Sequence, residues 1–239
     1  MINIVQTLES LSTFPELNSV LISCHRCPRL VAYREQVARD KKRAYRDWEY
    51  WGKPVPGFGD PAARVLVVGL APGAHGSNRT GRMFTGDSSG DFLFAALYRA
   101  GFASQPTSTR RDDGLVLKDI FISATCRCAP PDNRPTPVEI TSCLPYLRCE
   151  MALLRRVQVI VALGHIGFDT VLRLFKERSK DAHFDKHNFH FAHGASYPLG
   201  ENYPHLIASY HPSRQNTQTG RLTPVMFEAI WAAANSLLR

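Results

Sequence analysis

Three segments of the sequence combine residue types that can bind and act on a polar ligand. Residues 69–87 contain five glycines together with a histidine, an asparagine, two arginines and an aspartate. Glycine lets the backbone approach a ligand closely and expose its N–H groups. The segment has no Gly-Lys-Ser/Thr sequence and no well-placed G-x-G-x-x-G, so it is not a common nucleotide-binding loop. Its composition favours a binding loop over a plain connection.

The other two segments each carry one side chain suited to recognising a heterocycle. Residues 126–137 are rich in proline and contain Asn133, whose amide can donate and accept hydrogen bonds and can therefore pair with an imide or amide edge. Residues 210–216 contain His211, which is followed by Pro, Ser and Arg. The alternative is that Asn133 only shapes a turn and that His211 only fills the core.

The cysteines give the sequence a second kind of chemistry. Cys24 and Cys27 are three residues apart, a spacing at which two thiolates can bind one metal. Further ligands must come from the later cysteines, and spacing alone does not choose among them: Cys126, Cys128, Cys143 and Cys149. Four thiolates in a tetrahedral arrangement are typical of zinc.

Short apolar runs that alternate with helical patterns follow the N-terminal segment. Strands are predicted at residues 64–70, 119–124, 157–163 and 206–209, with an edge hairpin across 188–193. Helices are predicted at residues 1–20, 89–101, 138–154, 165–175 and 224–238. Such alternation indicates a parallel sheet that is covered on both faces.

These elements predict one α/β domain over residues 1–239. Its expected architecture is three layers, α/β/α, with a central four-stranded parallel sheet and residues 1–60 as an N-terminal extension. Ligands of open α/β sheets bind beyond the carboxyl ends of the strands. The three polar segments follow predicted strands, so we expect them to meet at that edge.

The composition limits the class of partner. Lys and Arg number 29 against 21 for Asp and Glu, and a net charge of +8 favours nucleic acid first and a membrane surface second. A hydrophobic content of 44% excludes disorder of the whole chain. No window approaches the roughly 18 apolar residues of a membrane span, and the N-terminal residues do not read as a secretory signal. We therefore expect a cytoplasmic protein without a membrane partner, in which reduced thiols bind metal.

The three segments together resemble the uracil-DNA glycosylase superfamily, and most closely its family 5, the type b enzymes. GLAPGAHGSNRTGRMFTGD, at residues 69–87, is similar to the first motif of that family over nearly its whole length. RCAPPDNRPTP, at residues 127–137, resembles the second conserved stretch, and HPSRQN, at residues 211–216, resembles the His-Pro-Ser motif. The correspondence runs in order from residue 24 to residue 216.

The resemblance implies a DNA repair enzyme that flips a deaminated base out of duplex DNA and hydrolyses its N-glycosidic bond. It implies that Phe84 stacks on the base, that Asn133 pairs with the uracil edge, and that His211 stabilises the negative charge of the departing pyrimidine. Gly69 and Ala71 would line the base pocket. The small residues there imply a substrate range that is wider than uracil and includes hypoxanthine.

The better-known families have an Asp or Asn two residues after the first glycine of the first motif, where it handles the attacking water. This sequence has Ala71 at that position. Family 5 suggests Asp87 as the substitute, with Asn216 helping to hold the water. An alanine is tolerable because preorganised donors to the departing anion can supply most of the rate gain.

Arginines in or near the three segments predict a basic rim for DNA phosphates, although scattered solvated charge is the alternative: Arg79, Arg82, Arg127, Arg134, Arg214 and Arg221. The expected contacts with double-stranded DNA are made by His75, Ser77, Asn78, Arg82, Ser213 and Arg214. Leu222 either wedges into the vacated base stack or packs in the core. We expect a monomer that associates with the nucleoid.

The resemblance also selects ligands among the later cysteines. It pairs Cys128 and Cys143 with Cys24 and Cys27, and families 4 and 5 hold a 4Fe-4S cluster with four such thiolates. The expected cofactor is therefore this cluster, with zinc as the other occupant, and it would tie residues 1–60 to the sheet. Cys126 and Cys149 would be buried as small apolar residues.

Two other functions fit part of the sequence. A zinc-containing nucleic-acid-binding module without catalysis accounts for the charge and the cysteines, but not for His211 beside a glycine-rich loop. A nucleotide phosphoesterase or nucleotide-sugar hydrolase would share the α/β scaffold. That chemistry usually needs clustered metal-binding carboxylates, which the sequence lacks.

Overall fold

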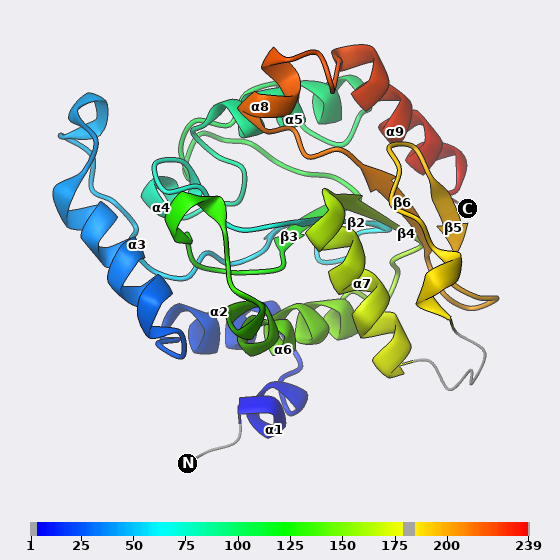
Figure 1. Cartoon of the computed structure of the whole chain (residues 1–239), viewed down its shortest axis with the longest axis horizontal. Coiled ribbons are helices and arrows are strands. Elements are labelled where there is room, and N and C mark those ends of the chain that lie inside the picture. Colours follow the sequence, from blue (N-terminus) through cyan, green and yellow to red (C-terminus); the bar gives the residue numbers. More distant parts are fainter. Residues whose placement is uncertain (1–3, 179–184, 239) are drawn as a thin grey trace.

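The computed structural model describes residues 4–178 and 185–238, and a mixed six-stranded sheet lies at its centre (Figure 1). Four parallel strands form the middle of the sheet in the order β3 (Ile120–Ala124), β2 (Val65–Gly69), β4 (Val159–Leu163) and β6 (His205–Ser209). Nearly every residue of these strands is buried, as is typical of parallel strands covered on both faces. The predicted four-stranded parallel core is confirmed.

Helices cover both faces of the sheet, which gives the three predicted layers (Figure 1). The main helices are α5 (Ser88–Arg99) and α9 (Pro224–Ser236) on one face, and α6 (Pro137–Leu153) and α7 (His165–Arg178) on the other. Successive side chains of a strand point to opposite faces. Val65 and Val67 of β2 therefore join the core under α5 and α9, whereas Leu66 and Val68 join the core under α6 and α7.

The N-terminal segment packs against α6. Its helices are α1 (Ile4–Glu9), α2 (Phe14–Ile22) and α3 (Pro28–Asp40). Leu8, Leu17 and Leu21 form a separate apolar cluster with Tyr146 and Cys149 of α6. An ion pair between Arg29 Nη2 and Glu139 Oε2, at 2.7 Å, adds a polar contact between α3 and α6. Protein contacts therefore hold this segment to the rest of the chain.

Two short helices complete the fold around the polar loops. They are α4 (Ser77–Thr80) and α8 (Arg214–Gln218), with single 3-10 turns at Arg43–Tyr45, Pro131–Asn133 and Lys186–Asn188. Leu222 is completely buried in the core under α9, so of its two predicted roles the structure favours packing.

Two expectations about the elements were wrong, and one edge strand was not predicted. The helix predicted over residues 1–20 is two helices, because Thr13 and Glu16 form a capping box that starts α2 afresh; residues 1–3 lie outside the described residues. The edge hairpin predicted across 188–193 is replaced by β5 (Ser196–Pro198), which pairs antiparallel with β6. A further edge strand, β1 (Phe58–Gly59), pairs antiparallel with β3.

None of the described helices is both long enough and apolar enough to span a membrane.

Candidate active site

The three polar segments leave the carboxyl ends of three of the four parallel strands, β2, β3 and β6. Residues 70–87 follow β2, residues 125–136 follow β3, and residues 210–213 follow β6. Backbone hydrogen bonds from Thr125 N to Gly69 O and from Cys126 N to Leu70 O, both 2.9 Å, hold the first two segments side by side. The predicted convergence at one edge of the sheet is therefore present.

Phe84 and His211 meet at this edge. Their ring centroids are 5.8 Å apart and the rings are inclined by 30°, a stacked arrangement. Phe84 adopts a φ of 51°, an unusual backbone conformation for an aromatic residue. A Cβ atom at Gly69 would lie 2.8 Å from Cζ of Phe84, so only glycine allows this ring to approach the end of β2.

Hydrogen bonds on both sides fix the backbone around His211. Asn216 Nδ2 donates to the carbonyl of His211 at 2.8 Å. The backbone N–H of Tyr210 donates to Nδ1 of His193 at 3.1 Å, and Nε2 of His193 donates to the carbonyl of Met226 at 3.2 Å. These contacts assign the proton of His193 to Nε2, because Nδ1 accepts.

A stack of side chains supports the same loop. The rings of His193 and Tyr210 are 5.0 Å apart and inclined by 25°, and the Arg221 guanidinium lies 4.7 Å from the centre of the Tyr210 ring. His193 was not predicted as a site residue, since nothing in its sequence neighbourhood distinguishes it from a surface histidine.

His211 itself is neutral at pH 7. Burial lowers the pKa of His211 to about 4, because desolvation penalises the charged ring. A neutral imidazole carries one N–H group, which can donate a hydrogen bond to an oxygen that gains negative charge. The histidine can therefore act as an electrostatic donor without first losing a proton.

Asp87 is the N-cap residue immediately before α5 and faces the glycine-rich loop. Its Oδ1 accepts hydrogen bonds from the backbone N–H groups of Ser89 (3.1 Å) and Gly90 (3.0 Å), so the carboxylate caps the helix. A Cβ atom at Gly76 would lie 1.9 Å from Oδ2 of Asp87, which shows how closely the loop packs on the carboxylate. Burial raises the pKa of Asp87, although the two N–H groups oppose this shift.

Asn133 lies on the second loop with its side chain exposed. It ends the 3-10 turn and has a φ of 55°, next to Asp132 with a φ of 54°. Within the described residues, no hydrogen bond or ring contact joins its side chain to Phe84 or His211. The structure therefore brings Asn133 to the same edge of the sheet without direct contact.

Comparison with known proteins decides the family. The sequence model of the uracil DNA glycosylase superfamily matches residues 56–235, which include all three loops. A type-5 uracil-DNA glycosylase of Thermus thermophilus is 54% identical over 217 residues, which cover 91% of this chain and 94% of that protein. Proteins of the same name from Mycobacterium leprae (48% identical, 94% of this chain and 96% of that protein) and Pyrobaculum aerophilum (45%, 85% and 84%) are also similar.

This chain belongs to the uracil-DNA glycosylase superfamily. The predicted resemblance is confirmed, and with it membership of a superfamily of enzymes.

Some of the residues that were expected to contact DNA are buried instead and form hydrogen bonds within the protein. Asn78 is fully buried and its Nδ2 donates to the carbonyl of Arg34 at 3.1 Å, while Ser77 is 2% exposed. His75 is partly exposed, and its Nδ1 lies 3.1 Å from the hydroxyl of Tyr50. Burial and the nearby cations Lys42 and Arg79 lower the pKa of His75.

Arg79 fastens the glycine-rich loop instead of pointing outward. Its Nε donates to the carbonyl of His75 at 2.8 Å and its Nη2 donates to the carbonyl of Gly86 at 2.9 Å. The Cζ atom of the guanidinium lies 3.9 Å from the centre of the Tyr45 ring and 4.0 Å from that of the Trp48 ring, an aromatic clamp that sequence patterns did not reveal. This clamp fixes the backbone immediately before Asp87.

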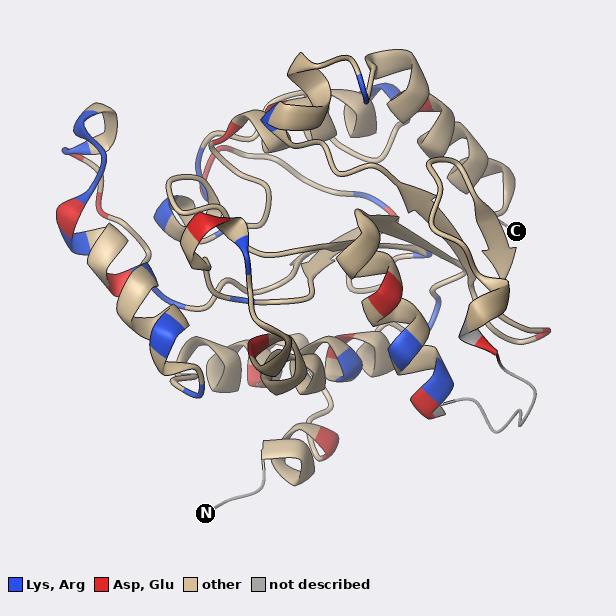
Figure 2. Ribbon diagram, in the orientation of Figure 1, with Lys and Arg blue, Asp and Glu red and all other residues tan. Residues whose placement is uncertain are grey.

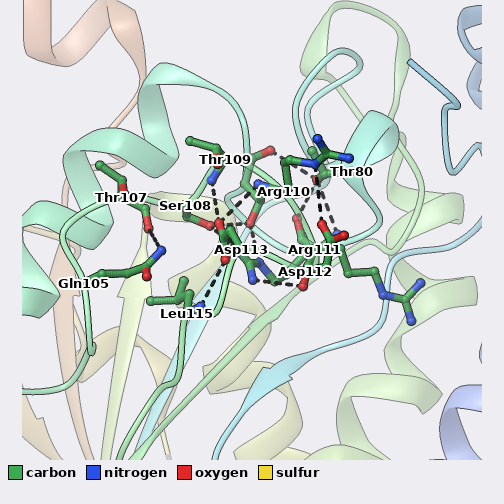
Figure 3. Close-up of polar contacts among 12 residues, drawn as sticks. Thr80, Gln105, Thr107, Ser108, Thr109, Arg110, Arg111, Asp112, Asp113 and Leu115 are labelled. Atoms are coloured by element: carbon green, nitrogen blue, oxygen red, sulfur yellow. Dashed lines mark hydrogen bonds and ion pairs between the residues drawn. The ribbon is translucent and has the colours of Figure 1, made fainter. Parts of the chain in front are cut away.

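Arg82 is likewise internal, within a network that Ser108 and Asp113 of another loop complete. Its Nη2 donates to Asp113 Oδ2 at 2.7 Å and to Ser108 Oγ at 2.8 Å, and its Nε donates to Thr85 Oγ1 at 3.0 Å. Asp113 also accepts from the backbone N–H groups of its own loop (Figure 3). The expected role of Arg82 at the DNA surface does not fit a guanidinium whose donors are used in this way.

Arg214 and Ser213 lie at the start of α8, beside His211. Arg214 is exposed, and Ser213 Oγ accepts from Asn216 N at 3.4 Å as the cap of the helix. Charged residues of both signs are distributed over the described helices and loops (Figure 2).

The four cysteines selected by the resemblance face one small cavity. Cys24 and Cys27 precede α3, Cys128 follows β3, and Cys143 is in α6; all four line the cavity together with Arg127 and Tyr146. Burial raises the pKa of Cys128 to about 12, while the Arg34 guanidinium opposes this shift. Three distant parts of the chain thus bring thiols to a single place.

The other two cysteines are buried, as expected. Cys126 is completely buried and its thiol contacts Cys143, which raises the pKa of Cys126. The thiol of Cys149 donates to the carbonyl of Leu8 at 3.3 Å. In the described parts of the chain, no three residues among His, Cys, Asp and Glu come close enough together to hold a single metal ion.

Proposed function

We propose that this protein excises uracil from double-stranded DNA as a monomer, by hydrolysing the bond between N1 of uracil and C1′ of the deoxyribose. The observation that carries the proposal is the stacked pair of Phe84 and neutral His211 at the carboxyl edge of the sheet, in a chain of this superfamily. The C–N bond breaks and its electron pair goes to the base. The oxygen of a water molecule bonds to C1′, and the proton of the water passes to the base or to solvent.

Each loop supplies one part of this chemistry. Phe84, against Gly69 and Ala71, offers an aromatic face on which an everted base can stack. The amide of Asn133 pairs with the base edge, and the imidazole N–H of His211 stabilises charge on the departing pyrimidine. Asp87 holds the attacking water with Oδ2, because its Oδ1 caps α5. The Oδ1 atom of Asn216 also accepts a hydrogen bond from this water.

The DNA contacts proposed here differ from those expected from sequence. His75, Ser213 and Arg214 are accessible at the edge where the base would enter, so these residues contact the phosphates. Ser77, Asn78 and Arg82 act indirectly, by holding the glycine-rich loop whose backbone N–H groups face the ligand. The small Ala71 leaves room for hypoxanthine as well as uracil, and the substrate is chromosomal DNA in the cytoplasm.

The deciding experiment uses duplex DNA with one uracil opposite guanine. After incubation with the protein, hot alkali should cleave the labelled strand at the uracil, because an abasic site is alkali-labile. An unmodified duplex is the control for substrate, and His211→Ala is the control for contaminating activity. Tight binding without alkali-labile sites would favour the nucleic-acid-binding module and contradict the proposal.

The cavity of four thiols is proposed to hold a 4Fe-4S cluster. The donor set fits such a group, because four thiolates are the usual ligands and each binds a different iron, which needs wider spacing than a single ion does. Cys24, Cys27, Cys128 and Cys143 would hold it. When bound, the cluster supplies structure, since it would tie the segment before α3 to β3 and α6.

Metal analysis of anaerobically purified protein tests this assignment. We expect iron and acid-labile sulfide in equal amounts, with the broad brown absorbance of a cluster, and Cys128→Ser should lose both. Stoichiometric zinc without sulfide would overturn the cluster.

A further inference from the structure

Arg34 of α3 is a buried cation directed at the cysteine cavity. Its side chain is 1% exposed, its Nη1 donates to Sγ of Cys128 at 3.0 Å and to the carbonyl of Cys24 at 3.3 Å. Nε of Arg34 is buried and has no hydrogen-bond partner among the residues that the structure describes. The guanidinium therefore touches two of the cysteine positions that line the cavity.

The charge of Arg34 is poorly balanced by carboxylates. Its nearest carboxylate oxygen is Glu35 Oε1, 3.7 Å from Nη2, on a side chain that is 43% exposed. A guanidinium keeps its charge in proteins, and burying an unpaired charge is costly. An anionic group in the cavity would provide the missing counter-charge.

A second buried arginine at the cavity, Arg127, has the buried carboxylate partner that Arg34 lacks. Arg127 is also 1% exposed, but it forms an ion pair with the equally buried Glu150, and its Nη2 donates to Ser123 Oγ at 2.8 Å. Arg127 is thus balanced inside the protein by a carboxylate. Arg26 also lines the cavity, but its side chain is exposed to solvent and donates to the carbonyl of Ser142 at 2.7 Å. Among the described residues, Arg34 is therefore the buried cation at the thiols that lacks a buried carboxylate partner.

We infer that Arg34 is the charge partner of the metal–thiolate group and donates a hydrogen bond to the Cys128 thiolate that helps to hold it. This inference rests on the proposed cluster. It assigns Arg34 a positioning role that the sequence did not suggest, since one arginine in a highly charged helix has no distinguishing signal.

Two measurable properties follow from this arrangement. A hydrogen bond to a charged sulfur strengthens the ligand, so losing it should ease the release of iron. Reduction by one electron from dithionite adds negative charge to the cluster, and a nearby cation favours the reduced state. Without Arg34, the midpoint potential should therefore become more negative.

The test compares Arg34→Gln, Arg34→Lys and the control Arg39→Gln in the full chain. Arg39 is exposed on the same helix, so this control makes the same change of charge away from the thiols. We expect Arg34→Gln to release iron to a chelator about tenfold faster than wild type, as for loss of a charged hydrogen bond. Its midpoint potential, followed by absorbance in a dithionite titration, should be lower. For Arg34→Lys, the rate of iron release and the midpoint potential should lie between those of wild type and Arg34→Gln. For Arg39→Gln, both should match wild type.

The outcomes separate the two proposals. Equal iron release and equal potentials in wild type and both Arg34 variants would overturn the role of Arg34 but leave the cluster standing. Wild-type protein without any bound metal would overturn both the cluster and the role of Arg34, whereas uracil excision is tested separately. If circular dichroism shows that Arg34→Gln does not fold, the comparison of Arg34→Lys with wild type decides.

Discussion

Nδ1 of His193 accepts the backbone N–H of Tyr210, the residue immediately before His211. The ring that carries this acceptor also stacks on the side chain of Tyr210. A histidine outside all three motifs therefore fixes the position of the proposed electrostatic donor.

Replacing His193 by alanine should lower kcat up to about tenfold with little change in KM. The loss corresponds to about 0.5–1.5 kcal/mol for one hydrogen bond that positions His211. Single-turnover excision of uracil measures the chemical step. His193→Asn, whose Oδ1 can replace the acceptor, should recover much of the rate, and an unrescued loss equal to that of alanine would argue against the role of Nδ1.

His211→Ala should slow excision about 100- to 1,000-fold. Removing one preorganised donor to a developing anion typically costs roughly 2.7–4 kcal/mol in the transition state. Affinity for uracil-containing duplex, measured by anisotropy with a non-hydrolysable nucleotide, should change little. Turnover at the wild-type rate would remove His211 from the mechanism.

The titration of His211 should appear in stability as a function of pH. Its pKa is about 4 in the folded protein and about 6.5 in the unfolded chain. Between these values only the unfolded state binds the proton, so this residue stabilises the fold above pH 6.5 and the contribution is lost as the pH falls toward 4. Urea unfolding of wild type and His211→Gln at several pH values measures the free energy of unfolding. Between pH 6.5 and pH 4, the variant should lose less of this free energy than wild type.

Asp87→Asn should abolish most excision while keeping the fold. Asparagine is as good a helix cap as aspartate, so the variant removes the charge of the carboxylate but retains the start of α5. Asp87→Ala should also lose the cap, at about 1 kcal/mol of unfolding free energy. DNA affinity should be largely kept in both. Asp91→Asn, in the first turn of the same helix, is the matched control, and an unchanged rate in Asp87→Asn would exclude the carboxylate from the reaction.

The ion pair of Arg82 and Asp113 should contribute strongly to stability. The two side chains are 4% and 10% exposed, and removing one partner of a buried pair costs about 3–5 kcal/mol. Asp113→Ala should therefore lower the unfolding free energy by about that amount, as measured in urea. The neighbouring Asp112 is 80% exposed, so Asp112→Ala should change stability by no more than about 0.5 kcal/mol.

The same pair predicts a second effect of acid. Burial opposes ionisation of Asp113, but the Arg82 guanidinium and backbone N–H groups lower the pKa of Asp113 to about 2. Its contribution is complete above the unfolded pKa of about 3.9 and is lost as the pH falls toward 2. Equal acid sensitivity of wild type and Asp113→Ala would contradict this assignment.

The sequence predicted the parallel core and the meeting of the three loops, because buried strands are marked by continuous apolar runs and their carboxyl ends must share an edge. It did not predict β1 and β5, which are two and three residues long and carry no such run. It missed the restart at Thr13, although the Thr13–Glu16 capping pattern is readable in retrospect.

Side chains that act through another residue were the hardest to find. The clamp of Tyr45 and Trp48 on Arg79, and the contact of His193 with Tyr210, join segments far apart in the chain. Arg82 was predicted to contact DNA because an arginine in a glycine-rich loop is expected to be exposed. Its partner, Asp113, lies on another loop, and the sequence does not show that the two side chains meet.

One continuous stretch of chain begins at the cysteine cavity and ends on the glycine-rich loop. It contributes Cys24 and Cys27 at its start, and its end pairs with that loop through hydrogen bonds from Trp51 N to Arg79 O (3.0 Å) and from Gly52 N to Asn78 O (3.1 Å). If the proposed cluster holds the start of this stretch, losing the cluster would also weaken the backbone pairing that supports the loop before Asp87. We therefore expect protein stripped of iron by a chelator to excise uracil more slowly than the same amount of untreated protein.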